Sequence, residues 1–146
     1  MALTAKISPL AFRADLGKLQ RKTEAKIIKL LHRMGQKGVD YARVNRGYTI
    51  QTANLISSIG YIIQKDGAVI AETFNYESKT AKGDNEGRKF AKSFGLSYPK
   101  GFVLIIVAGM NYAYAVEARG RDVLTGSSIF IKQKMPEMVA RLNQVL

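Results

Sequence analysis

Cysteine is absent from this sequence of 146 residues, and histidine occurs only once, at position 32. Without cysteine, the chain forms no disulfide, offers no thiolate nucleophile and holds no iron–sulfur cluster or cysteine-type zinc site. A single histidine also excludes a cluster of imidazole ligands, and no G-x-S-x-G nucleophile elbow is found. The phosphate-binding loop and the dinucleotide fingerprint are missing as well. We therefore expect no enzyme, no cofactor and no metal.

Long apolar runs and acidic residues are also scarce. No stretch approaches the roughly 18 apolar residues of a membrane span, and the first ten residues lack the apolar core of a signal peptide. We therefore expect a chain that stays in the cytoplasm and contacts no membrane. Only 11 Asp and Glu accompany 23 Lys and Arg, which gives a net charge of +12. The 47% of hydrophobic residues still supplies a core, so a single folded domain with an acidic partner is predicted.

Much of this charge lies on one predicted helix, from Leu16 to Val44. Apolar and small residues repeat there at helical spacing on one side. The opposite arc is basic and contains Lys18, Arg21, Lys22, Lys26, Lys29, Arg33, Lys37 and Arg43, of which the first seven form the candidate basic face. Eight basic and two acidic residues give this helix half of the net charge. The face predicts contact with an acidic protein or with nucleic acid, and a solvated helix face is the alternative. His32, at the edge of the arc, is interpreted as solvated.

An arm is predicted before this helix, and a short turn followed by a hairpin is predicted after it. Residues 1–14 are predicted to form an extended arm, with Asp15 as the helix cap. A single helical turn is expected within 52–58. Two strands, 59–64 and 68–74, then flank an Asp-Gly pair, which is a strong hairpin signal.

Residues 75–101 are rich in glycine, lysine and serine and are predicted to be a long loop with at most a short turn near Phe90 and Phe94. The apolar run 102–107 is expected to be a buried strand, and 111–118 a short helix. A helix within 127–146 contains Pro136, which either opens that helix or kinks it. Consecutive strands with helices at both ends indicate an α+β fold, in which 15–146 form one domain.

Two pairs of carboxylates are candidate metal ligands, and two tyrosines are candidates for stacking on nucleic-acid bases. Glu117 with Asp122, and Asp84 with Glu86, lack the spacing of a diagnostic metal site, so a metal-dependent nuclease is a distant alternative. Tyr112 and Tyr114 suit base stacking, but packing onto the apolar strand is the preferred interpretation.

Two short motifs have a counterpart in a known family. Residues 52–59 read T-A-N-L-I-S-S-I, and residues 112–117 read Y-A-Y-A-V-E, with a glycine shortly afterwards. They are similar to the T-G-x-L-x-x-S-I and Y-A-x-x-V-E motifs of tailed-bacteriophage tail-completion proteins, also called neck or head–tail joining proteins. The residues that carry the resemblance are Thr52, Leu55, Ser58, Ile59, Tyr112, Ala113, Val116, Glu117 and Gly120. Ala53 stands where the family has glycine, and 75–101 resembles an insertion.

The motif residues also have a direct physical interpretation. Thr52 is expected to cap the short turn, Leu55 and Ile59 to enter the core, and Ser58 to satisfy nearby backbone groups. Glu117 is expected either to anchor a subunit contact or to neutralise nearby positive charge.

The resemblance implies a structural virion protein of a phage or prophage, located at the neck or tail. Such a subunit would assemble as a ring in the host cytoplasm and contact connector or tail-tube proteins, without catalysing a reaction. Passing DNA, bound without sequence specificity, is a further expected contact. The alternative function is a nucleic-acid-binding module that uses the basic face of the first helix.

Overall fold

The computed structural model describes residues 8–77 and 82–145, which form five helices and three strands. Their order is α1 (Pro9–Val44), α2 (Asn54–Ser57), β1 (Ile59–Lys65), β2 (Ala68–Thr73), α3 (Lys82–Gly95), β3 (Phe102–Ala108), α4 (Ala113–Ala118) and α5 (Thr125–Val145). The predicted α+β fold is confirmed: a long first helix is followed by a small antiparallel sheet, a short helix and a C-terminal helix.

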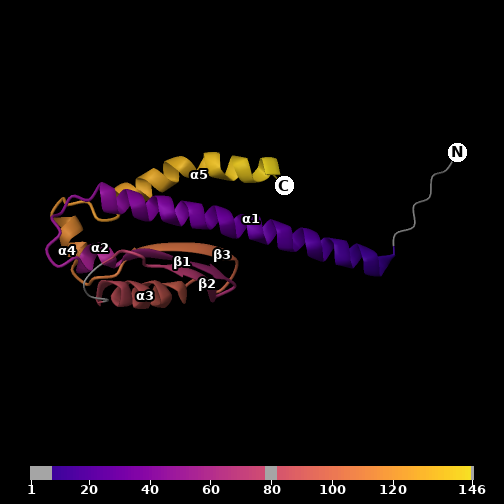
Figure 1. Cartoon of the computed structure of the whole chain (residues 1–146), viewed down its shortest axis with the longest axis horizontal. Coiled ribbons are helices and arrows are strands. Elements are labelled where there is room, and N and C mark those ends of the chain that lie inside the picture. Colours follow the sequence, from indigo (N-terminus) through magenta and orange to yellow (C-terminus); the bar gives the residue numbers. More distant parts are fainter. Residues whose placement is uncertain (1–7, 78–81, 146) are drawn as a thin grey trace.

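The elements stack in layers around the sheet (Figure 1). The strand order is β2-β1-β3, so β1 pairs antiparallel with both of its neighbours. Helix α3 packs on one face of this sheet, α1 packs on the other, and α5 lies against the outer side of α1. The central strand β1 is buried along nearly all of its length, because helices cover both of its faces.

The predicted hairpin is confirmed. The apolar strand is confirmed as a strand, but only Ile105 and Val107 of it are buried. Asp66 and Gly67 connect β1 to β2 with φ of 50° and 81°, as a tight two-residue hairpin turn requires. Strand β3 occupies the apolar run and pairs with β1 from Ile59 opposite Ala108 to Lys65 opposite Phe102. The sheet therefore contains the consecutive strands that the sequence indicates.

Helix α1 begins at Pro9, with Ser8 as its N-cap. The predicted extended arm is therefore wrong for residues 9–14, and Asp15 lies inside the helix instead of capping it. Residues 1–7 of that arm lie outside the described residues. Proline at the first helical position has the φ that a helix needs and loses no intrahelical hydrogen bond there. The helix has 36 residues and is about 54 Å long. Its N-terminal part, residues 9–22, extends beyond the body of the molecule, and we call it the projecting part of α1 (Figure 1).

Close approach of α1 to the sheet depends on glycine. A Cβ atom on Gly35 would lie 2.7 Å from the Tyr61 ring, and one on Gly38 would lie 2.7 Å from Ile106 Cδ1. The same contact region corrects the prediction for His32. It is half-buried, and its Nδ1 lies 3.0 Å from the hydroxyl oxygen of Tyr61, so this histidine joins α1 to the sheet.

Helix α3 is the largest departure from the sequence prediction, because it lies within 75–101, where a long loop is expected. Its buried side is formed by small residues four apart: Gly83, Gly87, Ala91 and Gly95. A Cβ atom on Gly87 would lie 2.6 Å from the carbonyl oxygen of Ser58. Because the helix buries small residues, it shows no apolar stripe of the kind that indicates helices from sequence.

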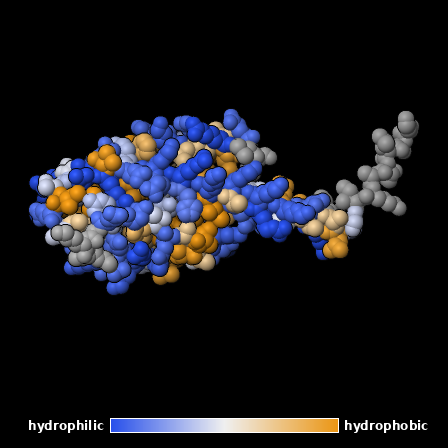
Figure 2. Space-filling model, viewed as in Figure 1, coloured by the Kyte–Doolittle hydropathy of each residue, from blue (hydrophilic) through white to orange (hydrophobic). Residues whose placement is uncertain are grey.

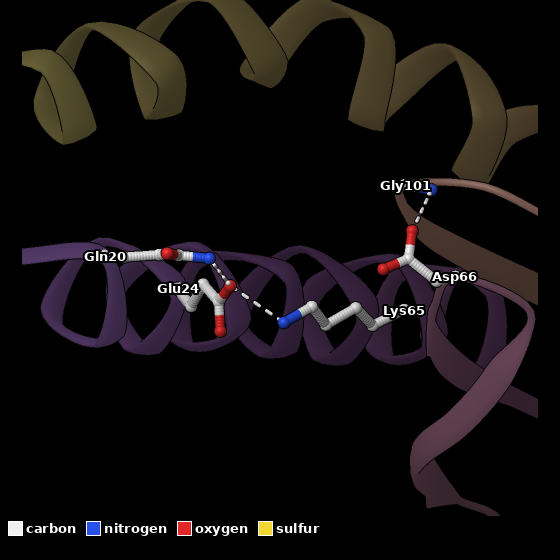
Figure 3. A network of polar contacts seen from close by, with 5 residues as sticks. All are labelled: Gln20, Glu24, Lys65, Asp66 and Gly101. Atoms are coloured by element: carbon white, nitrogen blue, oxygen red, sulfur yellow. Dashed lines mark hydrogen bonds and ion pairs between the residues drawn. The ribbon is translucent and has the colours of Figure 1, made fainter. Parts of the chain in front are cut away.

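A small polar network marks where α1 leaves the body (Figure 3). Lys65, at the end of β1, forms a salt bridge of 2.8 Å with Glu24, which also accepts a hydrogen bond from Gln20. The neighbouring Asp66 carboxylate accepts a hydrogen bond of 2.9 Å from the backbone N–H of Gly101. The hairpin turn is thereby linked on one side to α1 and on the other to the start of β3.

Pro136 lies in the interior of α5. Of the two alternatives for this proline, the structure therefore has the longer helix with the proline inside it, and not a helix that begins at the proline. Ile131 and Met138 of the predicted stripe are buried, whereas Met135 and Val139 are largely exposed. Within the residues that the structure describes, no helix combines the length and apolarity needed to span a membrane.

Candidate functional site

The two family-like motifs pack together in one core. Leu55, Ile59 and Ala113 are buried in the same hydrophobic cluster, and Val116 packs against it. Ser58 is fully buried, and its hydroxyl donates a hydrogen bond of 2.7 Å to the carbonyl oxygen of Leu55. The expected roles of these side chains in the core and at the turn therefore match their positions in the structure.

Thr52 has a different place from the one predicted. The N-cap of α2 is Ala53, which adopts a left-handed conformation with φ of 62°, and no side chain caps the helix. Thr52 is exposed and lines a cavity of about 470 Å³ together with Leu55, Tyr112 and Val116. The prediction that Thr52 caps the turn is therefore wrong, because the turn begins with a left-handed residue.

Glu117 caps the N-terminus of α5, a role that neither sequence interpretation included. Its carboxylate oxygens accept hydrogen bonds of 3.0 Å from the N–H of Leu124 and 2.9 Å from the N–H of Thr125. Burial raises the pKa of Glu117, but the hydrogen bonds from Thr125 and Leu124 outweigh burial and hold the pKa below its ordinary value of 4.5.

Asp122 adds a second cap by accepting a hydrogen bond of 3.0 Å from the N–H of Gly126. Both carboxylates therefore face the positive end of the α5 dipole. Gly120, just after α4, has a φ of 76°, which suits a glycine at the end of a helix. Within the described residues, no group of three or more His, Asp or Glu is placed to hold a metal ion.

Tyr112 precedes α4, and Tyr114 lies within it. The short helix packs onto the apolar strand as preferred, because Ala113 and Val116 share a hydrophobic cluster with residues of β3. The ring of Tyr114 does not take part in this packing. Tyr114 is 85% exposed and Tyr112 is 39% exposed. Tyr112 lines the same cavity as Thr52. The ring of Tyr114 is therefore available to an external partner.

The basic face divides into two parts along α1. Lys18, Arg21 and Lys22 are exposed on the projecting part, whereas the remaining four side chains face the region where α5 lies beside α1. These four are Lys26, Lys29, Arg33 and Lys37. Arg43, from the same predicted arc, lies elsewhere: it is half-buried and donates a hydrogen bond of 2.8 Å to the carbonyl oxygen of Ile59.

A groove of about 640 Å³ lies between α1 and α5, and we call it the basic groove. Its lining combines cations with apolar side chains: Lys26, Lys29, Leu30, Arg33, Lys37, Met138, Arg141 and Leu142. The sequence indicated the α1 side of this surface, but the contribution of α5 depends on how the two helices pack.

Exposed apolar side chains are concentrated in two further places. On the projecting part of α1, Leu10, Leu16 and Leu19 are 79%, 48% and 59% exposed. Figure 2 shows hydrophobic atoms near the end of this otherwise largely hydrophilic helix. On α3 and the segment after it, the half-exposed rings of Phe90, Phe94 and Tyr98 form a row, with centroids 6.4 and 5.8 Å apart.

Comparisons of the chain with protein-family models, curated proteins and solved structures gave no match.

Proposed function

We propose that this chain is a structural virion protein of a tailed phage or prophage, which assembles as a ring at the neck or tail end. The projecting part of α1 is the observation that carries this proposal. It presents three exposed leucines to solvent, and an isolated helix of this length is only marginally stable in water. A neighbouring subunit that covers these leucines would stabilise the helix and bury its apolar surface.

A ring suits this geometry. The projecting part and the body are different surfaces, so a contact between them on successive copies is heterologous, and such contacts close into rings when the rotation between copies permits. The two motifs contribute the rigid junction of α2, β1 and α4 rather than a reactive group, since most of their side chains are buried together. The function proposed is accordingly geometric: to complete the tail or to join the head to it.

Assembly of the purified full-length chain tests the proposal. We expect mass photometry and negative-stain electron microscopy to show rings, either alone or after addition of connector or tail-tube protein. The double substitution Leu16→Ser and Leu19→Ser should abolish them, whereas Lys18→Ser with Lys22→Ser, which has a similar cost in helix propensity, should not. A chain that forms no ring and binds neither partner at any concentration or salt would contradict the proposal.

Nucleic-acid binding is the second candidate function, supported by Lys18, Arg21 and Lys22. Within the described residues, none of these three forms a salt bridge with a carboxylate. Titration of duplex DNA at several salt concentrations tests it: binding should weaken steeply with salt and disappear on charge reversal of Lys18, Arg21 and Lys22. Undetectable affinity at low salt would exclude this function.

A further inference from the structure

We propose that the basic groove between α1 and α5 binds an acidic, amphipathic helical segment of a partner protein. This inference goes beyond ring assembly and does not depend on it, because the groove is separate from the projecting leucines. Three properties of the groove support it: its charge, its apolar floor and its shape.

The charge of the groove is of one sign. All five of its charged residues are Lys or Arg, and no carboxylate is present in the lining formed by the described residues. Arg141 has a local counter-charge, since it forms a salt bridge of 2.6 Å with Glu137 on the solvent side. Lys29, Arg33 and Lys37 are exposed on α1 and present positive charge to any occupant. An occupant rich in carboxylates is complementary to this surface.

These cations have the spacing of a helix partner. Lys26, Lys29, Arg33 and Lys37 follow one another at intervals of three, four and four residues, so they form a row along one side of α1. The row is about 16 Å long, which is roughly three helical turns. A partner helix with acidic residues at similar intervals would place its carboxylates along the row.

The floor of the groove distinguishes a protein partner from nucleic acid. Leu30 and Leu142 are half-buried and Met138 is buried, so apolar surface lies between the cations of α1 and Arg141 of α5. A phosphate backbone gains nothing from such a floor, whereas the apolar side of an amphipathic helix does. The methionine adds an adaptable side chain, as at other surfaces that accept helices.

The shape of the groove follows from the course of α5. Figure 1 shows α5 close to α1 near its start and farther from it towards its C-terminus. Pro136 lies between these two parts and removes a donor from the helical hydrogen bonds, which bends helices. The opening therefore lies where Met138 and Leu142 face Leu30.

A second copy of this chain is a poor occupant. The chain carries a net charge of +12. Among the helices that the structure describes, the two longest, α1 and α5, are the ones that a second copy could offer to the groove. Both contain more basic than acidic residues, so docking either of them here would bring like charges together. The partner is therefore a different, acidic protein.

Fluorescence anisotropy with the full-length chain tests the inference. The probe is a labelled synthetic peptide of about 15 residues, with leucine on one helical face and glutamate on the other. One control peptide has the same composition in scrambled order, and a second control is a short DNA duplex. At about 0.15 M salt we expect the amphipathic peptide to bind at least about tenfold more tightly than the scrambled peptide.

Substitutions then locate the binding site. Lys29→Glu with Arg33→Glu should weaken binding of the peptide at least about tenfold, and Leu142→Ser should weaken it about threefold or more. Lys18→Glu with Lys22→Glu makes the same change of charge outside the groove and should change the affinity less than about threefold. Circular dichroism verifies that each variant remains folded.

Four outcomes would overturn the inference. The first two concern the ligand: the scrambled peptide binds as tightly as the amphipathic peptide, or the DNA duplex binds more tightly than the peptide. The other two concern the variants: the groove substitutions leave the affinity for the peptide unchanged, or Lys18→Glu with Lys22→Glu lowers it as much as they do. None of them bears on ring formation, so failure here is distinguishable from failure of the proposed function.

Discussion

The ring of Tyr61 occupies the space that a side chain at Gly35 would need. A Cβ atom there would lie 2.7 Å from Tyr61 Cδ2, well inside ordinary van der Waals contact. Tyr61 is itself almost fully buried and holds His32 of the same helix, so its ring has little freedom to withdraw. The distance between α1 and the sheet is thus set by this pair of residues.

Gly35→Ala should therefore destabilise the protein by about 1–3 kcal/mol, although alanine is the better helix former. Gly17→Ala is the matched control, since its Cβ would meet only Arg21 Nη1, at 3.6 Å. It should stabilise the protein by up to about 1 kcal/mol. Urea unfolding of both variants measures the difference, and a stabilised Gly35→Ala variant would show that α1 has room to move away from the sheet.

Gly87→Val should destabilise the protein by about 2–4 kcal/mol, because the larger side chain would separate α3 from the sheet. Lys89→Val places the same residue on the exposed side of α3 and removes only a surface ion pair of 4.0 Å with Glu86. It should change stability by less than about 0.5 kcal/mol. Thermal unfolding followed by circular dichroism compares the two, and similar losses for both would mean that valine acts through helix propensity alone.

Ala53→Gly should stabilise the protein by about 1 kcal/mol. A left-handed conformation costs an alanine roughly 1–2 kcal/mol that glycine does not incur, and part of this gain is offset by the greater freedom of glycine in the unfolded chain. The φ of 62° at Ala53 falls in this region. The midpoint of urea unfolding should rise, and a fall would mean that the strain at Ala53 is compensated by its packing.

Glu117→Gln should cost about 1 kcal/mol at neutral pH, since the amide offers one acceptor where the carboxylate offers two to the N-terminus of α5. The pKa of Glu117 is lower in the folded chain than its ordinary value of 4.5, so its charge stabilises the fold above about pH 4.5. That contribution is lost as the pH falls through the folded pKa. The stability difference between the two proteins should therefore narrow below about pH 4.5 in urea titrations, and a difference independent of pH would rule out the charge as its cause.

Tyr48→Phe should leave stability unchanged or raise it by up to about 1 kcal/mol, because the buried hydroxyl oxygen has no hydrogen-bond partner. Burial also raises the pKa of Tyr48 to about 12. Ultraviolet titration of the wild-type chain should show one tyrosine that ionises near this pH and is missing from the variant. Destabilisation by more than 1 kcal/mol would instead indicate a bound water at the hydroxyl.

Elements with large apolar side chains or a diagnostic turn were predictable from the sequence. The Asp66–Gly67 pair and the apolar run of β3 specify their structures through contacts between near neighbours in the chain. Helix α3 was not predictable in this way, since its buried residues are glycine and alanine. The repetition of small residues at every fourth position from Gly83 to Gly95 is the signal that would have indicated it.

The candidate site was predictable only in part, because it combines residues that are far apart in the sequence. The basic face of α1 follows from helical periodicity, but the groove needs Met138 and Arg141 from a helix about 100 residues later in the sequence. The partners of Glu117 are backbone N–H groups, which have no signature in a sequence. His32 was misassigned because its partner, Tyr61, lies on another element.

The salt bridge between Glu24 and Lys65 has a consequence for proteolysis. N-terminal to Glu24, the lysines and arginines of α1 are exposed on the projecting part, which extends beyond the rest of the described residues, so local fraying there costs little free energy. Trypsin should therefore release this segment from isolated subunits and leave the body intact. If neighbouring copies cover the segment, assembled subunits should resist trypsin there, and the fraction of uncleaved chain would measure the extent of assembly.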